Sequence, residues 1–463
     1  MKKENIMIIG AGPCGSLLAL RLAQLGYNIT VYEKRPDLRN TDISAGKSIN
    51  LALSDRGLKA MQMVGVTDKV KELCIPMNGR MIHPNQEENF LSPYSGLEEE
   101  YINSISRTDL NALLIDEAEK MPNVSIHFNQ ECLSVDLEKT QASFQDYQTK
   151  ETYHKTADLI FGTDGAGSAL RKSMMDSHEF LFSYSQDYLT HGYKELSIEP
   201  NAKGEFQLYK NALHIWPRKE NMLIALPNLD GSFTVTLFLA YKTGEHNFNN
   251  LTTPEKVESY FKEFYPDAFA LMPNLGKEFF ENPTGTLGTV KCTPWQSYGK
   301  TLLMGDAAHA IVPFYGQGMN ASFEDVVVFN EALKKHQGNW EDTFNRYEKM
   351  RKKDTDAIAD LAIDNFHEMK AHTAAPIFQE KRKLETAFEE NTPKEYASKY
   401  RLVTFQEEIG YAEAMAKGRA QDKAILQLIA ENKINNKMSL QEKLNLVQEQ
   451  TQKILTEKDL LAY

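Results

Sequence analysis

Residues 6–33, IMIIGAGPCGSLLALRLAQLGYNITVYE, decide the fold. The apolar run at residues 6–9 is typical of a short buried strand. Residues 16–25 are strong helix formers at helical spacing, and Gly26 marks the end of that helix. Residues 28–32 predict a second strand. The stretch therefore predicts a strand–helix–strand unit and places the chain in the α/β class.

Three glycines with the spacing G-x-G-x-x-G lie in the turn between the first strand and the helix. Gly10 permits a tight turn, Gly12 lets the backbone approach a pyrophosphate, and Gly15 lets the helix pack closely against the strand. The helix N-terminus offers N–H groups and a positive dipole to phosphates. Glu33 ends the second strand, where an acidic side chain can bind ribose hydroxyls. We therefore predict a dinucleotide site, with a plain structural turn as the alternative.

Two later stretches repeat one pattern, in which an apolar strand runs into a turn of small residues. Residues 158–171 read DLIFGTDGAGSALR, with Asp164 in the turn. Residues 302–309 read LLMGDAAH, with Asp306 at the corresponding place, and the loop GQGMN follows at residues 316–320. Either stretch alone fits an ordinary strand–loop–helix junction. Together, in this order after the glycine turn, they favour a cofactor site.

The composition excludes several other classes of protein. The 463 residues include 52 Lys and Arg against 64 Asp and Glu, a net charge of −12, which argues against a general nucleic-acid binder. The four cysteines form no CxxC pair, so a zinc ribbon or a dithiol redox motif has no support. The 11 histidines do not cluster at metal-ligand spacing, and we expect no metal site. No apolar stretch approaches the ~20 residues of a membrane span, and we expect a cytoplasmic protein without a membrane anchor.

The rest of the chain divides into a strand-rich and a helical part. Residues 203–240 contain short alternating runs, such as those at 205–209 and 233–238, which predict an antiparallel sheet. From about residue 323 the chain is helical and rich in charge, with a break at residues 391–393. The amphipathic tail, residues 438–463, could cover a substrate domain, bind a partner helix or lie on a membrane surface. Its Glu and Gln content disfavours the membrane.

The three motifs resemble the FAD-binding signature of the flavin-dependent aromatic hydroxylases. Further stretches are similar to the branch of this family that hydroxylates L-kynurenine: residues 46–54 (GKSINLALS), 76–83 (PMNGRMIH), 191–196 (HGYKEL), 214–218 (HIWPR) and 305–325 (GDAAHAIVPFYGQGMNASFED). The resemblance implies resident FAD, transient NADPH and oxygen transfer from O2 through a flavin C4a-hydroperoxide, giving 3-hydroxy-L-kynurenine. One alternative is a related hydroxylase acting on another aromatic acid. Another is a flavin-binding protein without catalytic activity.

The resemblance also implies a substrate site. Arg80 and Tyr94 match positions that hold the substrate carboxylate, and Asn365 and Tyr400 match the other polar anchors. Phe314 and Pro313 would line the pocket beside the flavin ring. No acid–base catalytic residue is expected, because the aniline nitrogen of the substrate already activates the ring carbon that is hydroxylated. A surface arginine and half-buried packing tyrosines are the alternatives for residues of these types.

The implied FAD site combines the glycine turn with positions from other parts of the chain. Outside that turn these positions fall in seven segments, and the full set is Gly10, Gly12, Cys14, Gly15, Tyr32, Glu33, Lys34, Arg35, Ala52, Arg107, Cys132, Asp164, Asp306, Met319 and Asn320. The two cysteines in this set are expected to contribute backbone or packing rather than a thiol.

We therefore predict a Rossmann-like FAD-binding domain of the aromatic hydroxylase type, a β-sheet substrate domain and a helical C-terminal region. The FAD-binding domain is predicted to be discontinuous, with residues 1–70, 101–175 and 291–345. Residues 71–100 and 176–290 would form the substrate domain, and residues 346–463 the helical region. An oligomer is possible.

Overall fold

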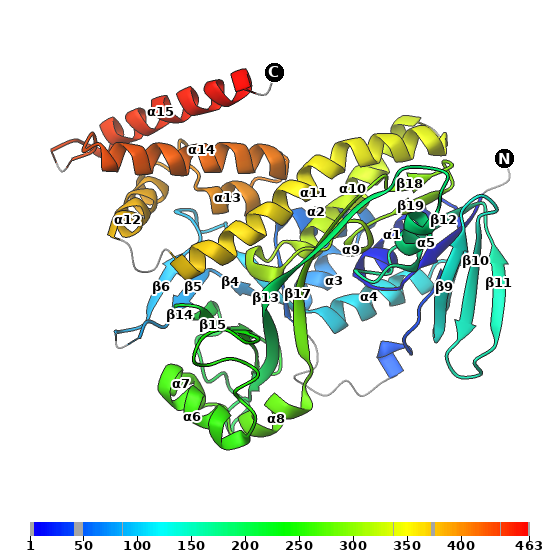
Figure 1. Cartoon of the computed structure of the whole chain (residues 1–463), viewed down its shortest axis with the longest axis horizontal. Helices are drawn as coiled ribbons and strands as arrows, with labels where there is room; N and C mark the ends of the chain where they lie inside the picture. Colours follow the sequence, from blue (N-terminus) through cyan, green and yellow to red (C-terminus); the bar gives the residue numbers. More distant parts are fainter. Residues whose placement is uncertain are drawn as a thin grey trace.

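The computed structural model describes residues 4–40, 50–85, 87–336, 338–371, 376–435 and 437–461. Figure 1 shows an α/β part near the N-terminus, a part built on a larger antiparallel sheet, and helices that continue to the C-terminus. This arrangement agrees with the predicted fold class. Of the stretches that carry the family resemblance, residues 46–49 lie outside the described residues.

A six-stranded sheet forms the centre of the α/β part, in the order β18-β19-β12-β1-β2-β8. All neighbours are parallel except the pair β18–β19. Its strands are β1 (Asn5–Ile9), β2 (Asn28–Tyr32), β8 (Val124–His127), β12 (Leu159–Gly162), β18 (Gln296–Ser297) and β19 (Thr301–Leu303). The apolar runs predicted as strands at residues 6–9 and 28–32 are confirmed, and the first is buried because helices cover both faces of such a sheet.

The predicted first helix is also confirmed, as α1 (Pro13–Gln24), which begins before the predicted start because proline is compatible with the first helical turn. The main core contains side chains of α1, the central strands and several more helices. These helices are α2 (Asp55–Val64), α3 (Thr67–Glu72), α4 (Arg107–Glu119), α5 (Ala169–Asp176), α9 (Asp306–His309), α10 (Gly318–His336) and the first turns of α11 (Trp340–Ala371). The 3-10 turns are η1 (Leu38–Asn40) and η2 (Pro313–Tyr315).

Two three-stranded sheets flank this part. One has the order β3-β7-β4 and contains β3 (Asn50–Leu53), β4 (Cys74–Met77) and β7 (Ile102–Ser106). The other has the order β11-β10-β9 and contains β9 (Gln130–Asp136), β10 (Gln141–Asp146) and β11 (Thr152–Thr156).

A seven-stranded sheet has the order β17-β13-β16-β15-β14-β5-β6 and is antiparallel except between β14 and β5. Its strands are β5 (Gly79–Ile82), β6 (Phe90–Pro93), β13 (Ser183–Ile198), β14 (Leu213–Arg218), β15 (Asn221–Pro227), β16 (Phe233–Ala240) and β17 (Thr284–Thr293). Figure 1 shows that the long pair β13–β17 runs between the α/β part and the region of α6–α8. One face of the sheet packs against α6 (Pro254–Phe264), α7 (Pro266–Phe269) and α8 (Leu275–Glu281).

The antiparallel sheet predicted for residues 203–240 is confirmed for 233–238, which lie in β16, but wrong for 205–209, which form no strand. The side chain of Asn201 accepts hydrogen bonds from the backbone N–H groups of Lys203 and Glu205, at 2.9 and 3.0 Å. This turn bends the chain away from the sheet. Phe206 and Leu208 then pack on the core beneath α6–α8, which explains the alternating pattern without a strand.

The C-terminal part contains α11 (Trp340–Ala371), α12 (Pro376–Asn391), α13 (Lys399–Thr404), α14 (Tyr411–Ala430) and α15 (Leu440–Leu461). The predicted domain boundary at residues 345–346 falls within α11, and the one at 290–291 falls within β17. The division into domains therefore stays a prediction. Within the described ranges, each helix is too short or too polar to traverse a lipid bilayer.

Candidate active site

The three sequence motifs meet at the carboxyl ends of β1, β12 and β19. The Thr163 hydroxyl, after β12, donates to the carbonyl of Gly10 at 2.8 Å. Gly10 has a φ of +98°, and a Cβ there would lie 2.7 Å from the Thr163 carbonyl oxygen. The Arg171 guanidinium donates to the carbonyl of Ala307 at 2.7 Å, which joins the second motif to the third. Stretches far apart in the sequence thus form one edge of the sheet.

The other two glycines of the turn have opposite surroundings. A Cβ at Gly15 would lie 2.0 Å from the Gly10 carbonyl oxygen, so only glycine allows α1 to pack this closely. A Cβ at Gly12 would meet no described atom within 4 Å. Gly12 therefore faces open space at the N-terminus of α1, which is where a pyrophosphate would bind.

Glu33 connects the end of β2 to this turn. Its Oε2 accepts a hydrogen bond from the Ala11 N–H at 2.8 Å, and its Oε1 pairs with Arg35 at 2.7 Å. Burial alone would raise the pKa of Glu33, but Arg35 and the backbone donors outweigh it and lower the pKa. The carboxylate is therefore anionic and can accept hydrogen bonds from ribose hydroxyls. Lys34 is exposed beside it.

Three further predicted positions lie on the adjoining strands. Tyr32 is buried, and its ring stacks on Phe144 of β10 with centroids 4.2 Å apart. Cys132 of β9 lies opposite Phe144 in the register of the two strands. Burial, together with the carboxylate of Asp164, raises the pKa of Cys132 to about 12, so its thiol stays protonated. Asp164 thus lies near Cys132 at the β12 end of the site.

Asp306 begins α9 in an unusual environment. Its side chain is exposed, yet the protein atoms around it raise the pKa of its carboxyl, an effect that Arg107 and His309 oppose. Arg107 begins α4 and is also exposed, and its positive charge acts on the Asp306 carboxyl.

Cys14 has a packing role in the glycine turn. A Cβ at Gly305 would lie 3.0 Å from the Cys14 sulfur, and the Cys14 thiol donates to the Ser322 carbonyl at 3.6 Å. Burial, followed by the charges of Asp325 and Asp306, raises the pKa of this thiol well above its ordinary value. Cys14 is therefore not a nucleophile.

The predicted loop at residues 316–320 is wrong in part, because α10 already begins at Gly318. Gly316, with a φ of +69°, turns the chain from η2 into α10, and Met319 and Asn320 lie in the first helical turn. The Asn320 amide donates to the Ala52 carbonyl at 2.8 Å and accepts from the Ser54 N–H at 3.0 Å. Asn320 and Ala52 are thus held together beside the N-terminus of α10, which can stabilise negative charge on a flavin ring.

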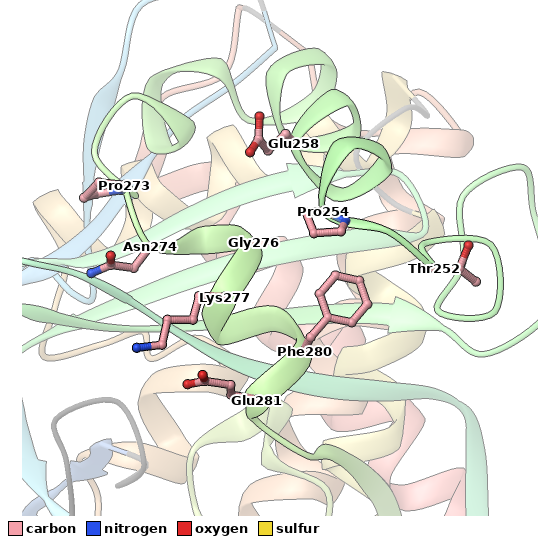
Figure 2. A pocket seen from close by; sticks show the side chains of 9 residues that line it. All are labelled: Thr252, Pro254, Glu258, Pro273, Asn274, Gly276, Lys277, Phe280 and Glu281. Atoms are coloured by element: carbon pink, nitrogen blue, oxygen red, sulfur yellow. The ribbon is translucent and has the colours of Figure 1, made fainter.

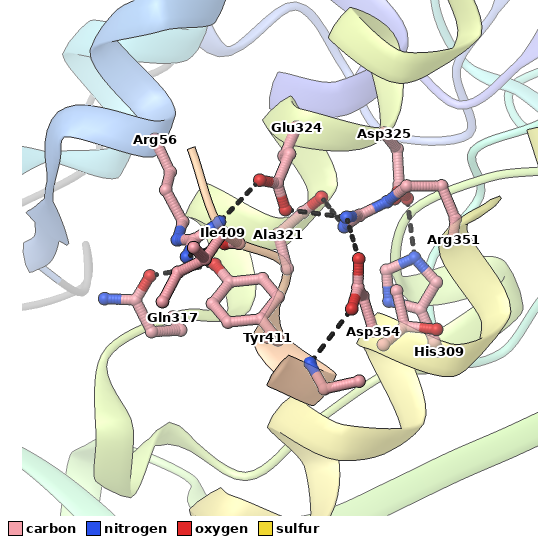
Figure 3. A network of polar contacts seen from close by, with 12 residues as sticks. Arg56, His309, Gln317, Ala321, Glu324, Asp325, Arg351, Asp354, Ile409 and Tyr411 are labelled. Carbon is pink, nitrogen blue, oxygen red and sulfur yellow. Dashed lines mark hydrogen bonds and ion pairs between the residues drawn. The ribbon is translucent and has the colours of Figure 1, made fainter. Parts of the chain in front are cut away.

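A buried network of charged groups joins these segments to the C-terminal helices (Figure 3). Asp325 of α10 accepts from the Gly305 N–H at 3.0 Å, from His309 at 2.5 Å and from Arg351 at 2.7 Å. Burial alone would raise the pKa of Asp325, but His309 and Arg351 outweigh it and lower the pKa. The ionised carboxylate therefore fixes the turn that precedes Asp306.

The neighbouring carboxylate extends the network toward the chain end. Glu324 pairs with Arg56 at 2.7 Å and with Arg351 at 2.6 Å. The Arg56 guanidinium lies 4.2 Å from the centre of the Tyr411 ring, and the Tyr411 hydroxyl donates to Gln317 at 3.0 Å. Helix α14 is thereby connected to the segment between η2 and α10. Sequence reasoning missed these supporting residues, because their spacing along the chain gives no sign that they meet.

The predicted substrate anchors form a cluster. The Arg80 guanidinium, on β5, lies 4.1 Å from the ring centre of Tyr400 and 5.2 Å from that of Tyr94. The two rings stack with centroids 5.5 Å apart. No carboxylate of the described residues pairs with Arg80. The Tyr94 side chain is 2% exposed, and its hydroxyl has no hydrogen-bond partner among the described groups. Tyr315, which sequence reasoning missed, stacks on Tyr400 at 5.6 Å, and only its place between Phe314 and Gly316 could have suggested it.

Asn365, Phe314 and Pro313 form a second wall. The Asn365 amide donates to the Phe314 carbonyl at 2.7 Å and so fixes η2, which begins at Pro313. The Phe314 ring contacts Phe238 and Phe366, with centroids 5.0 and 4.7 Å apart. The structure thus places Asn365 in a supporting position, with its amide N–H bound to the backbone.

The residues present fit FAD. Gly12 faces open space, Asp306 is exposed at the start of α9, and the buried Oδ1 of Asp164 has no hydrogen-bond partner among the described residues. The phosphates of a bound dinucleotide would occupy the space at Gly12, and its hydroxyl groups would donate hydrogen bonds to the two carboxyl groups. Ala52 also packs against the core cluster that contains Tyr94, so the flavin side and the Arg80 side adjoin.

A separate groove of about 600 Å³ lies between α6 and α8 (Figure 2). It contains none of the predicted site residues. Its lining is Thr252, Pro254, Glu258, Pro273, Asn274, Gly276, Lys277, Phe280 and Glu281.

Comparison with solved structures shows the fold. The tetrameric form of 2-methyl-3-hydroxypyridine-5-carboxylic acid oxygenase matches with a TM-score of 0.65 and 21% identity, over 81% of this chain and 95% of that chain. PqsL of Pseudomonas aeruginosa, in complex with 2-aminobenzoylacetate, matches with a TM-score of 0.64 and 16% identity, over 80% of this chain and 98% of that chain.

Comparison with sequences shows the family. Residues 3–362 match the model of a family described as FAD binding domain. The kynurenine 3-monooxygenase of Myxococcus xanthus is 45% identical over 87% of this chain and 86% of its own length. The kynurenine 3-monooxygenase of Flavobacterium johnsoniae is 44% identical over 97% of this chain and 99% of its own length. That of Dictyostelium discoideum is 43% identical over 93% of this chain and 94% of its own length. The chain therefore belongs to the kynurenine 3-monooxygenase family of FAD-binding proteins.

Proposed function

We propose that this chain hydroxylates L-kynurenine at ring carbon 3, with FAD as resident cofactor, O2 as oxygen donor and NADPH as reductant. The observation that carries the proposal is the surroundings of Arg80, a guanidinium between two tyrosine rings with no carboxylate partner among the described residues. Such a site suits an aromatic substrate that carries a carboxylate.

The proposed roles of the substrate residues follow from their chemistry. Arg80 would pair with the substrate carboxylate through its planar fork. Burial raises the pKa of Tyr94 well above its ordinary value, so the hydroxyl stays protonated and would donate to the same carboxylate. Tyr400 would complete this anchor, and the Phe314 wall fixed by Asn365 would exclude water from the ring of the substrate.

The proposed roles of the cofactor residues follow from the geometry of the glycine turn and from the exposed groups at the starts of α4 and α9. The turn at Gly12 and the N-terminus of α1 would hold the pyrophosphate, and Glu33 would bind the ribose. Asp306 would accept a hydrogen bond from the ribityl chain, and the positive charge of Arg107 would offset negative charge near it. When bound and reduced, FAD activates O2 and delivers one oxygen atom to the substrate. The aniline nitrogen of kynurenine donates electron density to carbon 3, so the protein needs only to orient and shield the ring.

The test uses the purified holoenzyme. NADPH oxidation, 3-hydroxykynurenine and H2O2 are measured with and without L-kynurenine, and NADH replaces NADPH in a parallel series. We expect strong stimulation, near-equal product and NADPH consumed, and weaker activity with NADH. 2-Aminoacetophenone, which keeps the aniline and the ketone but lacks the amino acid group, serves as a control and should not stimulate. Stimulation that yields only H2O2, or none at all, would contradict the proposal and favour a related aromatic acid as substrate.

A further inference from the structure

Tyr400 reaches the Arg80 cluster from α13, a helix of only 6 residues. A helix this short has little stability of its own, so contacts outside the helix must fix its orientation. The position of the Tyr400 ring is therefore determined by whatever holds α13 against the rest of the chain.

The buried side chains of Leu402 and Val403 pack α13 into an apolar core, and two ion pairs on either side of Tyr400 add directional contacts. The next residue, Arg401, binds Glu100 through two hydrogen bonds: Nε to Oε2 at 2.6 Å and Nη2 to Oε1 at 2.8 Å. The side chains of Arg401 and Glu100 are 5% and 12% exposed. The preceding residue, Lys399, pairs with Asp422 of α14 at 2.8 Å. The Arg401–Glu100 pair has the planar two-bond geometry that is most directional among ion pairs.

Glu100 lies on the segment that continues from Tyr94. Residues 95–101 connect Tyr94 to β7, and this segment packs tightly on α12, where a Cβ at Gly96 would lie 1.9 Å from the Glu389 carbonyl oxygen. Glu389 in turn accepts from the Ser398 N–H, at the start of α13, at 3.1 Å. The Arg401–Glu100 pair therefore connects the segment behind Tyr94 directly to the helix that carries Tyr400.

We propose that Glu100 and Arg401 are positioning residues that set the spacing of the Tyr94 and Tyr400 rings around Arg80, and with it the affinity for the substrate carboxylate. The inference rests on the proposed function, since it concerns how the same site recognises its substrate. Neither residue is assigned contact with substrate or cofactor. They act through Tyr400, whose ring centre lies 4.1 Å from the Arg80 guanidinium.

The test compares Glu100→Gln and Arg401→Lys with the wild-type holoenzyme. Glu100→Gln keeps the shape but removes the charge, and Arg401→Lys keeps the charge but removes the two-bond geometry. L-Kynurenine affinity is measured by titration of the flavin absorbance, and KM and kcat by turnover. We expect both variants to weaken binding and raise KM about tenfold, with kcat within about twofold, since one charge-assisted contact of the substrate is misplaced.

A control pair and a double variant separate positioning from general stability. Asp37 and Arg39 form a similar two-bond pair, at 2.8 and 2.7 Å, away from the substrate cluster. Asp37→Asn should leave L-kynurenine affinity unchanged. Glu100→Gln combined with Tyr400→Ala should bind no more than about twofold more weakly than Tyr400→Ala alone, because the side chain through which the pair acts is absent.

The outcomes distinguish the two proposals. Wild-type protein that binds but does not hydroxylate L-kynurenine overturns the proposed function alone. Wild-type protein that does not bind L-kynurenine overturns both. Affinity unchanged in Glu100→Gln and Arg401→Lys overturns the positioning role, and so does an equal loss with and without the Tyr400 side chain. A fall in kcat and FAD content at unchanged affinity also overturns it, because it would assign the pair a purely structural role.

Discussion

Tyr94→Phe is expected to change stability and substrate affinity in opposite directions. The hydroxyl is buried and has no partner among the described groups, and such a hydroxyl costs about 1–3 kcal/mol. Phenylalanine removes this cost and keeps the ring that stacks on Tyr400. The free energy of unfolding without substrate should therefore rise by about 1 kcal/mol. A hydroxyl that donates to a carboxylate contributes about 1.5–3 kcal/mol, so KM for L-kynurenine should rise roughly 10- to 150-fold.

The assay pairs urea unfolding of the substrate-free holoenzyme with steady-state kinetics. Tyr241→Phe is the matched control, because the Tyr241 hydroxyl donates to the Gly285 carbonyl at 3.1 Å. That variant should lose about 1 kcal/mol of stability at unchanged KM. A Tyr94→Phe protein that is less stable than wild type and has an unchanged KM would refute the reasoning, because the hydroxyl would then have a structural partner and no role in substrate binding.

Three further predictions concern the cofactor turn, the anchor and acid stability. Gly12→Ala should fold with normal stability but bind FAD at least about tenfold more weakly, as measured by FAD titration. In Gly15→Ala the Cβ would lie 2.0 Å from a backbone oxygen, so thermal melting should show a protein that fails to fold or loses several kcal/mol of stability. Arg80→Gln should raise KM roughly 100-fold without lowering stability, and an unchanged KM would rule out this anchor. Burial lowers the pKa of His214 from its ordinary 6.5 to about 4, so between these pH values the unfolded chain binds a proton that the folded chain does not. As the pH is lowered from 6.5 to 4, the free energy of unfolding should therefore decrease by about 1.4 kcal/mol per pH unit for this residue. Urea unfolding at several pH values should show a smaller slope in His214→Asn and an unchanged slope in the exposed control His154→Asn.

Local patterns predicted local structure well, and the reason is physical. The strand–helix–strand unit depends on apolar spacing and on glycines whose positions have purely steric causes, such as the contact of Gly15 with the turn. The two later motifs were predicted to belong to one cofactor site because of their order after the glycine turn, and in the structure they meet because the carboxyl ends of parallel strands lie at one edge of the sheet. The strand at 205–209 was wrong because alternating residues such as Phe206 also pack from an irregular segment when a turn redirects the chain.

The supporting contacts could not be predicted, since they depend on where distant segments pack. Nothing in the spacing of Arg56 and Glu324 indicates that α2 and α10 bring them within 2.7 Å. The same holds for Glu100 and Arg401, which meet only because α13 folds back over the segment after Tyr94. The family resemblance supplied the anchors Arg80 and Tyr400, whereas the groups that hold those anchors appeared only in the structure.

The arrangement of charge around the site separates two tasks that a flavin hydroxylase must perform. Asp325, which fixes the cofactor turn, and its neighbour Glu324 are paired with arginines inside the protein. Arg80 is surrounded by neutral phenols and has no carboxylate partner among the described side chains. A paired charge makes a rigid support, and a cation among neutral rings makes a receptor for an anion. The substrate carboxylate would thus complete the charge balance of the pocket, so that the pocket reaches its full complement of polar contacts only when the substrate is bound.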